Sequence, residues 1–371
     1  MGDRKISMIG TLPPIKGVSP YTLNLVINLA KKVEIDFYGF KEIYPEFLYP
    51  GKSSKHGVIP YIKKVNIHNI LTWYNPLSWF LVGFKINTKI LHAQWWSWFL
   101  APIYFVILII AKLRLKKIII TMHNVIPHER AFYKILLNKI IIFLADVIIV
   151  HSKNNKETLI KELNIKKRIY VIPHGIIKIE KSKKKKNELL KKCGFSKKDK
   201  ILIFFGNIRE YKGIDILLEA LYKFNDKNIK LIIAGQPWIK FDNYYKMIEK
   251  FDLKEQVKLF LNYNSEEKIA ELFKIADVAV FPYKKFDAAS GAASVALNFE
   301  KPMIVTDVGG LIDMVGDKKL IAIHNNSEDL MKKINYSLKN LKKIKIVFNK
   351  IKKLYLWNFI VKATLRVYNE C

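Results

Sequence analysis

Two cations stand in a short loop where they could bind an anion. The stretch 201–221 reads ILIFFGNIREYKGIDILLEAL, which puts Arg209 and Lys212 between an apolar run that ends at Gly206 and an amphipathic run that begins near Gly213. The first run predicts a buried strand and the second a helix. Open α/β sheets bind ligands outside the carboxyl ends of their strands. Solvated loop charge is the alternative, and the neighbouring glycines favour a binding role.

A second stretch predicts a helix N-terminus that could bind the same kind of ligand. It reads AVFPYKKFDAASGAASVALNFEKPMIVTDVGG and predicts a buried strand at Val278–Phe281, a small-residue loop at 288–291 that opens a helix, and a strand at Met303–Thr306 before Gly309 and Gly310. The first turn of a helix leaves N–H groups unpaired and carries partial positive charge. An ordinary strand-to-helix turn is the alternative.

Together these two loops predict a diphosphate site. Arg209 and Lys212 would supply positive charge, and the N–H groups near Ser290 would supply backbone donors. The residues that this hypothesis assigns to binding a phosphorylated donor are Gly206, Ser290, Gly291, Ala292, Gly309 and Gly310.

A third polar cluster follows a predicted strand in the first half of the chain. Residues 121–130 read TMHNVIPHER and contain His123, His128 and Glu129. Two histidines, an asparagine and a glutamate at the end of a buried strand are costly to place in a plain turn, so we interpret the cluster as part of a site.

The positions of these motifs follow from an alternation of strand and helix patterns. Strands are predicted at residues 5–10, 33–38, 63–66, 118–121, 146–151, 168–173, 200–205, 230–234, 257–259, 278–281 and 303–306, with helices at 20–31, 131–144 and 355–369 among those between them. A lysine-rich run at 178–186 reads as a solvated linker between two domains. Ser152 is expected to cap a helix. The alternation predicts two doubly wound α/β domains facing across a cleft.

These motifs, in this order, resemble the GT-B glycosyltransferases of family 4. The resemblance rests on IGTLPPIKGVSPYTLNL, TMHNVIPHE, DVIIVHS with IYVIPHG, GNIREYKG, LIIAGQ, FPY with ASG and KPMIVTDVGGL, and YLWNFIVKATLRVYNE, and so covers nearly the whole chain. It implies an N-terminal acceptor-binding domain at residues 1–177 and a nucleotide-sugar-binding domain at 178–354. A last helix at 355–371 would pack back on the first domain.

The resemblance also implies roles for single residues. His123 would lie beside the donor sugar and, with Arg209 and Lys212, form the catalytic set. The acceptor side would include Gly17, whose loop could equally be a simple tight turn, together with His128 and Glu129. The family commonly has two glutamates that contact sugar and ribose; the matching positions here are Asp287, assigned to the donor, and Val295, which cannot donate or accept a hydrogen bond. No bound metal or cofactor is implied.

Composition adds a strong charge bias. The chain of 371 residues has 64 Lys and Arg against 32 Asp and Glu, a net charge of +32. Such a chain attracts polyanions, and because no nucleic-acid-binding motif is present, an anionic membrane surface is the favoured partner. The apolar segment 95–111, WWSWFLAPIYFVILIIA, is read as a buried crossover helix rather than a membrane span, since the α/β alternation continues after it. Two distant cysteines and a start without signal-peptide pattern predict a cytoplasmic protein.

The sequence therefore predicts a glycosyltransferase of the hexosyltransferase type. It would transfer a sugar from a nucleotide-sugar donor to a lipid-linked or glycan acceptor, with retention, at the cytoplasmic face of the cell membrane. Two other classes stay open: another GT-B enzyme, such as a sugar-nucleotide epimerase or a phosphorylase, and a basic nucleic-acid-binding protein.

Overall fold

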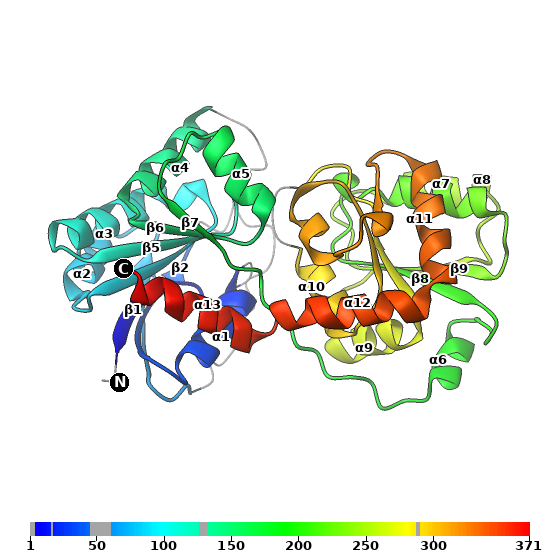
Figure 1. Cartoon of the computed structure of the whole chain (residues 1–371), viewed down its shortest axis with the longest axis horizontal. Coiled ribbons are helices and arrows are strands. Elements are labelled where there is room, and N and C mark those ends of the chain that lie inside the picture. The colour runs from blue at the N-terminus through cyan, green and yellow to red at the C-terminus, as the bar shows by residue number, and fades with distance from the viewer. Residues whose placement is uncertain (1–3, 16–17, 45–60, 126–131, 287–289) are drawn as a thin grey trace. The chain divides into compact units, whose positions relative to one another are not determined.

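The chain forms two compact units in a computed structural model, which describes residues 4–15, 18–44, 61–125, 132–286 and 290–371 (Figure 1). The first unit comprises Met1–Gly175 and Leu356–Cys371, and the second comprises Ile176–Tyr355. The sequence-based boundary after residue 177 lies two residues beyond this division.

Among the described residues, the first unit is built on a seven-stranded parallel sheet in the order β3-β2-β1-β4-β5-β6-β7. Its strands are β1 (Lys5–Gly10), β2 (Glu34–Glu42), β3 (Val65–Thr72), β4 (Ile90–Trp95), β5 (Lys117–Met122), β6 (Val147–Val150) and β7 (Arg168–Val171). Its helices are α1 (Ser19–Leu29), α2 (Pro76–Lys85), α3 (Ala101–Leu113), α4 (Phe132–Leu144), α5 (Lys153–Lys161) and α13 (Trp357–Asn369).

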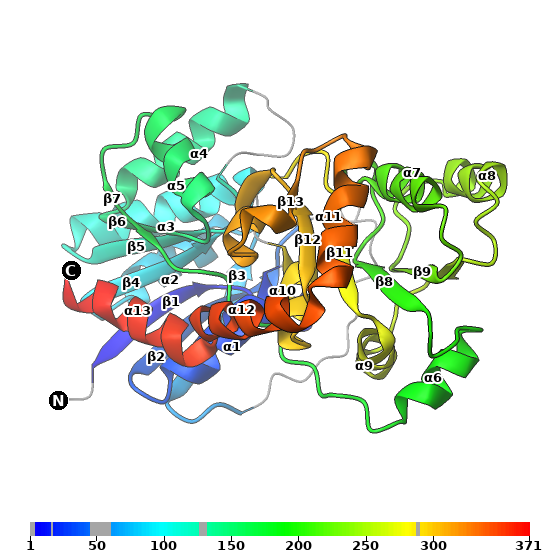
Figure 2. The same ribbon diagram turned by 45° about the vertical axis from the view of Figure 1, so that its right-hand side comes forward.

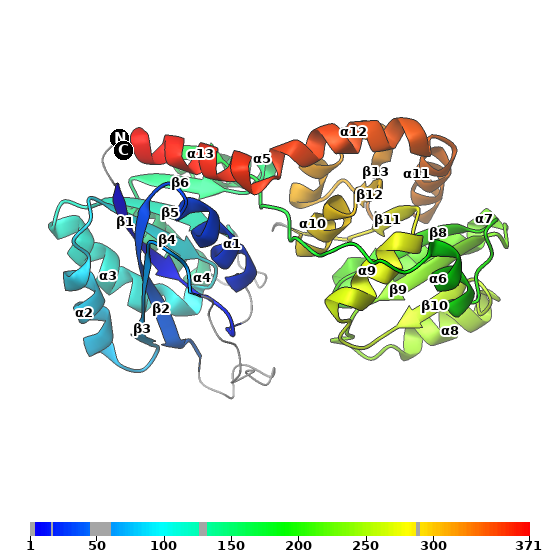
Figure 3. The same ribbon diagram turned by 90° about the horizontal axis from the view of Figure 1, so that it is seen from below.

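Both faces of this sheet are covered because successive strand residues point to opposite sides. In β5, Ile118 and Ile120 pack into a core that includes side chains of α2, α3 and α4, whereas Ile119 packs into a core with α1 and α13. Figure 3 shows α2, α3 and α4 on one side of the sheet, with α1 and α13 on the other. The last helix thus packs against α1 within the first unit.

The structure corrects the assignment of the apolar segment that begins at Trp95. Trp95 ends β4, which pairs with β1 and β5, and the helix begins only at Ala101 after a short 3₁₀ turn. The sequence reading missed β4 because His92 and Gln94 interrupt its apolar pattern. The crossover helix α3 is confirmed. No helix in the described ranges has the length and apolar character needed to cross a bilayer.

The second unit repeats the arrangement with a six-stranded parallel sheet, counted over the residues described, in the order β10-β9-β8-β11-β12-β13 (Figure 2). Its strands are β8 (Lys200–Phe205), β9 (Ile229–Ala234), β10 (Val257–Phe260), β11 (Val278–Phe281), β12 (Met303–Thr306) and β13 (Ile321–Ala322). Its helices are α6 (Lys186–Lys192), α7 (Ile214–Phe224), α8 (Asp242–Lys250), α9 (Glu266–Ile275), α10 (Gly291–Asn298), α11 (Ser327–Lys339) and α12 (Leu341–Leu354). The predicted fold class, two Rossmann-like α/β domains, is confirmed.

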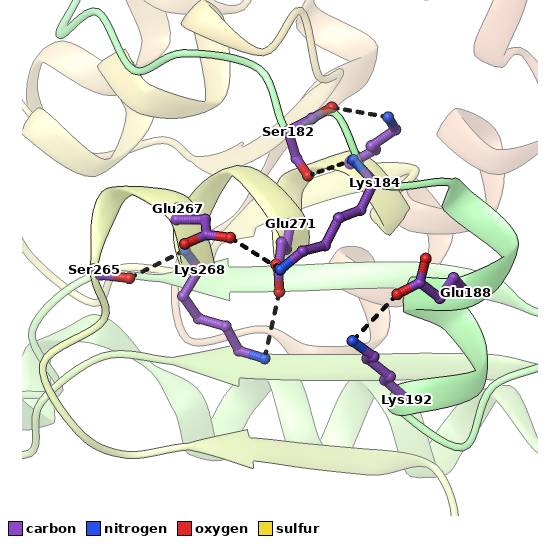
Figure 4. A network of polar contacts seen from close by, with 9 residues as sticks. Ser182, Lys184, Glu188, Lys192, Ser265, Glu267, Lys268 and Glu271 are labelled. Carbon is purple, nitrogen blue, oxygen red and sulfur yellow. Dashed lines mark hydrogen bonds and ion pairs between the residues drawn. The ribbon is translucent and has the colours of Figure 1, made fainter.

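The lysines of the run 178–186 are exposed, as predicted, but the run belongs to the second unit. Lys184 reaches both Glu267 and Glu271 on α9, and Lys274 of the same helix donates to the main-chain oxygen of Ser182 at 2.9 Å (Figure 4). Acidic side chains of α9 therefore fix this segment to the second unit, a pairing that a run of lysines cannot reveal by itself.

Candidate functional site

The loops of the second unit meet where its strand order reverses. β8 and β11 are neighbours, yet the chain proceeds from β8 outward to β10 and from β11 outward to β13. In parallel sheets such a switch point opens a crevice at the carboxyl ends of the strands. The loops after β8 and β11 touch here, because a Cβ added at Gly206 would lie 3.2 Å from the Cβ of Ala292.

The loop after β8 is anchored by a glycine that no other residue can replace without strain. Gly213 ends a 3₁₀ turn, Glu210–Lys212, and begins α7 with φ of +69°, a conformation that favours glycine. A Cβ at this position would lie only 1.9 Å from the main-chain oxygen of Pro282. The main-chain N–H of Lys284 also donates to the oxygen of Tyr211 at 2.8 Å. These contacts hold Lys212 against the loop that follows β11.

Lys212 is a buried cation surrounded by aromatic rings. Its Nζ lies 3.7 Å from the ring centroid of Tyr283, 5.1 Å from that of Tyr211 and 5.0 Å from that of Phe286, and only 8% of the residue is exposed. Burial, followed by the positive charge of Arg209, lowers the pKa of Lys212 to about 7. Within the described ranges Lys212 has no ion pair with a carboxylate. A bound anion would therefore favour the charged ammonium of Lys212, which burial disfavours.

Tyr283 joins this cation to the N-terminus of α10. Its hydroxyl lies 3.3 Å from Oγ of Ser290, and the same Oγ accepts from the N–H of Ala293 at 3.3 Å as the N-cap of the helix. The N–H groups of the first turn, at Gly291 and Ala292, have no acceptor within the helix. The structure thus brings Lys212 and the 290–292 turn to one place. Sequence reasoning missed Tyr283, although an aromatic residue directly after a buried strand is a usable signal.

Arg209 is held on the other side of the loop by a tryptophan. Its guanidinium carbon lies 4.4 Å from the ring centroid of Trp238, which is 49% exposed, and the main-chain N–H of Trp238 donates to the main-chain oxygen of Ile208 at 2.9 Å. This stacking restrains a long cationic side chain beside Lys212. Trp238 was also missed, since it follows β9 and belongs to neither predicted loop.

The remaining predicted donor residues lie at the adjacent strand. Gly309 has φ of +57° and begins a 3₁₀ turn, Gly309–Met314, after β12, with Gly310 buried beside it. β12 neighbours β11, so this turn is at the same edge of the sheet. Val295 is 4% exposed and packs in the core of the second unit. Asp287 lies outside the described residues.

In the first unit, His123 belongs to a buried chain of hydrogen bonds at the ends of β4, β5 and β6. Nδ1 of His151 donates to the oxygen of Ile172 at 3.0 Å, so its Nε2 accepts from Nδ1 of His123 at 3.2 Å. With this tautomer Nε2 of His123 accepts. The atom placed 2.9 Å from it is Oε1 of Gln94, and Nε2 of the same amide lies 3.3 Å from Nε2 of His92, so the amide donates to His123 once its oxygen and nitrogen are exchanged.

The chain continues through His92. Its Nε2 lies 2.7 Å from Oγ1 of Thr121 and its Nδ1 lies 2.6 Å from the hydroxyl of Tyr368 on α13. Every histidine in this sequence of bonds is neutral: burial lowers the pKa of His92 and of His151 to about 3 and that of His123 well below its usual range. Both ring nitrogens of His123 are consequently used by the protein. Its main-chain N–H is used as well, since it donates to the oxygen of Trp95 at 2.8 Å.

The predicted acceptor-side residues Gly17, His128 and Glu129 lie outside the described residues. The chain on either side of Gly17 is described, and there the hydroxyls of Thr11 and Ser19 are buried without a hydrogen-bond partner in the part of the structure described. Across the described ranges, no group of three or more His, Cys, Asp or Glu side chains is arranged to hold a metal ion.

Comparisons with known proteins agree with this architecture. The model of Glycosyltransferase Family 4 matches residues 15–177, and the model described as Glycosyl transferases group 1 matches residues 185–353. Two parallel Rossmann-like sheets define the GT-B class of glycosyltransferases. With both models matching in succession, the chain belongs to the group 1, family 4 glycosyltransferases.

Solved structures share the fold. Sucrose-phosphate synthase from Thermosynechococcus elongatus has a TM-score of 0.73 and 18% identity, with 99% of this chain and 98% of that chain covered. The Anabaena protein HepE in complex with UDP has a TM-score of 0.74 and 14% identity, with 99% and 100% covered.

Relatives in sequence cover less. An uncharacterized glycosyltransferase of Methanocaldococcus jannaschii is 26% identical over 235 residues, which are 60% of this chain and 59% of that protein. The GDP-mannose:glycolipid 4-beta-D-mannosyltransferase of Xanthomonas campestris pv. campestris is 28% identical over 104 residues, 28% of this chain and 29% of that protein. The matched region thus spans less than two thirds of these relatives.

Proposed function

We propose that this glycosyltransferase is a hexosyltransferase that transfers a sugar, with retention, from a nucleotide-sugar donor to a lipid-linked or glycan acceptor at the cytoplasmic face of the cell membrane. The observation that carries the proposal is the buried ammonium of Lys212, 3.7 Å above the Tyr283 ring whose hydroxyl contacts the N-cap Ser290. A desolvated cation and a helix N-terminus at one strand edge suit a diphosphate.

The proposed chemistry follows from the leaving group. When the bond between sugar and diphosphate breaks, negative charge grows on the diphosphate and positive charge on the sugar ring. Lys212 and Arg209 stabilise the departing diphosphate, assisted by the N–H groups of Gly291 and Ala292. Because these groups are positioned before the reaction, little reorganisation is needed as the charge develops.

The sugar and the acceptor have their own proposed contacts. The main-chain carbonyl of His123 holds a sugar hydroxyl, and the histidine chain fixes the position of this residue. Asp287 contacts the sugar, Gly309 and Gly310 border the donor, and Gly17, His128 and Glu129 serve the acceptor. The donor is a substrate, and the proposal includes no resident cofactor or metal.

The proposal draws support from the relatives' names. The Xanthomonas enzyme is named for GDP-mannose and a glycolipid, and the HepE structure contains UDP. These names favour a nucleotide-sugar donor here and are compatible with a lipid acceptor.

The test is release of nucleoside diphosphate. Purified protein is incubated with UDP-, GDP- and ADP-sugars, with and without membrane lipid extract, and the diphosphate is measured. We expect release from one donor that increases with lipid extract. Release from none of them would overturn the proposal, turnover of donor without any acceptor would favour an epimerase, and a requirement for inorganic phosphate would favour a phosphorylase.

A further inference from the structure

An exposed apolar stripe runs along α2 in the first unit. Leu77, Phe80, Leu81 and Phe84 are 77, 48, 47 and 61% exposed, and their spacing of three and four residues puts them on one side of the helix. The buried residues of α2 are Ser78, Val82 and Gly83. This helix therefore presents a continuous apolar face to solvent, the reverse of the polar face expected on a surface helix.

The next two helices, α3 and α4, also expose apolar side chains. On α3, Phe105, Ile109 and Leu113 are 40, 36 and 79% exposed. On α4 the exposed apolar residues, again at helical spacing, are Phe132, Tyr133, Leu136, Ile140 and Phe143.

We call the exposed apolar side chains of these three helices the α2–α3–α4 face. The three helices cover the same side of the sheet (Figure 3). α2 and α3 pack so closely that a Cβ added at Gly83 would lie 2.7 Å from Cδ1 of Ile110. Arg114, just after α3, donates to the oxygens of Gly83 and Ile86 at 3.2 and 2.9 Å. Exposed apolar stripes on three helices that cover one side of a sheet mark an interaction site.

The charge around this face is one-sided. Residues 75–146 contain nine Lys and Arg and two acidic residues, so their net charge is 9 − 2 = +7. Each helix carries an exposed lysine, Lys85, Lys112 or Lys139, and of these Lys112 pairs with Asp146 at 2.6 Å. An apolar face with a basic surround is the pattern of protein segments that lie in the interface of an anionic bilayer.

We propose that the α2–α3–α4 face docks this protein on a bilayer that contains anionic lipid. The exposed leucine and phenylalanine side chains enter the boundary between headgroups and acyl chains, and the lysines contact lipid phosphates. A second copy of the chain fits this face poorly, because a two-fold symmetric contact would place the lysines of one copy against the lysines of the other. This proposal rests on the proposed function: docking places the first unit beside a lipid-linked acceptor.

The experiment is cosedimentation of the full chain with two kinds of vesicle, one of phosphatidylcholine alone and one that also contains phosphatidylglycerol. The test variant carries Leu77→Ser, Leu113→Ser and Phe143→Ser, one change on each helix. The control variant carries Tyr263→Ser, Ile323→Ser and Ile346→Ser, which are 87, 54 and 61% exposed in the second unit. All six side chains are exposed, so folding is retained, and circular dichroism verifies this.

We expect the wild type and the control variant to bind the anionic vesicles. The test variant should bind at least about tenfold more weakly, because three apolar side chains no longer leave water. Part of the wild-type binding should persist at high salt. Two results would overturn the proposal: equal binding by the test variant and the wild type, or binding that high salt abolishes completely. Either result would mean that the net positive charge alone attracts the protein to the vesicles.

A further outcome separates a protein partner from a membrane. If the wild type binds no vesicles and sediments as a dimer that the test variant does not form, the face is an interface between copies and the proposal is wrong. Binding of UDP, GDP and ADP to the same variants keeps the two proposals apart. Vesicle binding with no nucleotide binding would contradict the proposed function and leave the docking face standing.

Discussion

Replacing Lys212 by methionine removes the buried ammonium while keeping an unbranched side chain over the ring of Tyr283. The pKa of Lys212 is about 7 in the free protein. A diphosphate charge about 4 Å away would favour the ammonium by about 4 kcal/mol per unit charge at an effective dielectric of 20. Because 1.36 kcal/mol corresponds to one pH unit, the pKa in the complex should rise to about 10. Binding a nucleoside diphosphate above pH 7 must therefore take up a proton.

The number of protons taken up on binding depends on pH. At pH 8 about one tenth of the free protein carries the ammonium, so binding should take up about 0.9 proton. The affinity should also fall about fiftyfold between pH 7 and pH 9, since the competent fraction falls from about one half to about one hundredth. Lys212→Met should bind weakly at both pH values and take up no proton at pH 8.

The assay is isothermal titration calorimetry of the diphosphate in buffers with different ionisation enthalpies, whose slope gives the number of protons taken up. Lys258→Met, an exposed change on β10, is the matched control and should behave as the wild type. Uptake near zero at pH 8 in the wild type, or equal uptake in Lys212→Met, would refute the reasoning.

The same lysine has a consequence for stability. Its pKa is lower in the folded protein than its usual value of 10.5, so the folded state binds fewer protons between pH 7 and 10.5. The cost is complete below pH 7 and disappears as the pH approaches 10.5; its upper limit is (10.5 − 7) × 1.36, or about 5 kcal/mol. Lys212→Met should therefore raise the thermal unfolding midpoint of the free protein at pH 7, by less at pH 9.5. A midpoint that falls at pH 7 would show that the lysine is not desolvated.

Three other predictions follow from the packing. His151→Phe leaves Nδ1–H of His123 without its acceptor at a cost of about 1–3 kcal/mol, and should lower kcat for sugar transfer while diphosphate affinity, measured by calorimetry, stays unchanged. Acidification from pH 6.5 to 5.5 should destabilise the first unit by about 4 kcal/mol, because His92, His123, His151 and His174 are neutral when folded and become charged when unfolded, and each contributes about 1 kcal/mol over this interval. A urea unfolding series with the exposed His324→Gln as control measures this, and a flat profile would contradict it. Gly213→Ala should lower the unfolding midpoint by several degrees and weaken diphosphate binding, since its Cβ meets main-chain oxygen at 1.9 Å; unchanged scans would contradict the loop geometry.

Much of the fold could be read from the sequence because both sheets are parallel and buried on both faces. The strands β1, β8, β11 and β12 have the bounds predicted from their mostly apolar runs. β4 could not be found this way, since His92 and Gln94 are polar; His92 bonds to Thr121 on β5 and Tyr368 on α13, and Gln94 contacts His123 just after β5. Local pattern cannot anticipate a hydrogen bond that joins residues 92 and 368.

The candidate site was predicted in part for the same reason. Glycines, cations and a helix start can be read along the chain, and this reading found Lys212 and Ser290. It could not find Tyr283 as the residue that joins them, nor Trp238 as the support of Arg209, because both roles depend on loops that only folding brings together. The burial of Lys212, which gives it a lowered pKa, has no signature in the sequence.

The sequence was least informative about surfaces. The apolar segment 95–111 was read as buried, yet α3 exposes three apolar residues among its 13, and its neighbours α2 and α4 expose four of 10 and five of 13. Only coordinates separate the two sides of such a helix. The exposed side chains carry the docking proposal, and the buried ones carry the fold.

The central claim is that the second unit binds two linked phosphates between Lys212 and the 290–292 turn. The most direct measurement is a thermal-shift panel of UDP, GDP and ADP against UMP, GMP and AMP, on the wild type and on Lys212→Met. One diphosphate should raise the melting temperature well above the matching monophosphate, and the difference should vanish in the variant. Diphosphates that stabilise the wild type no better than their monophosphates would contradict the claim.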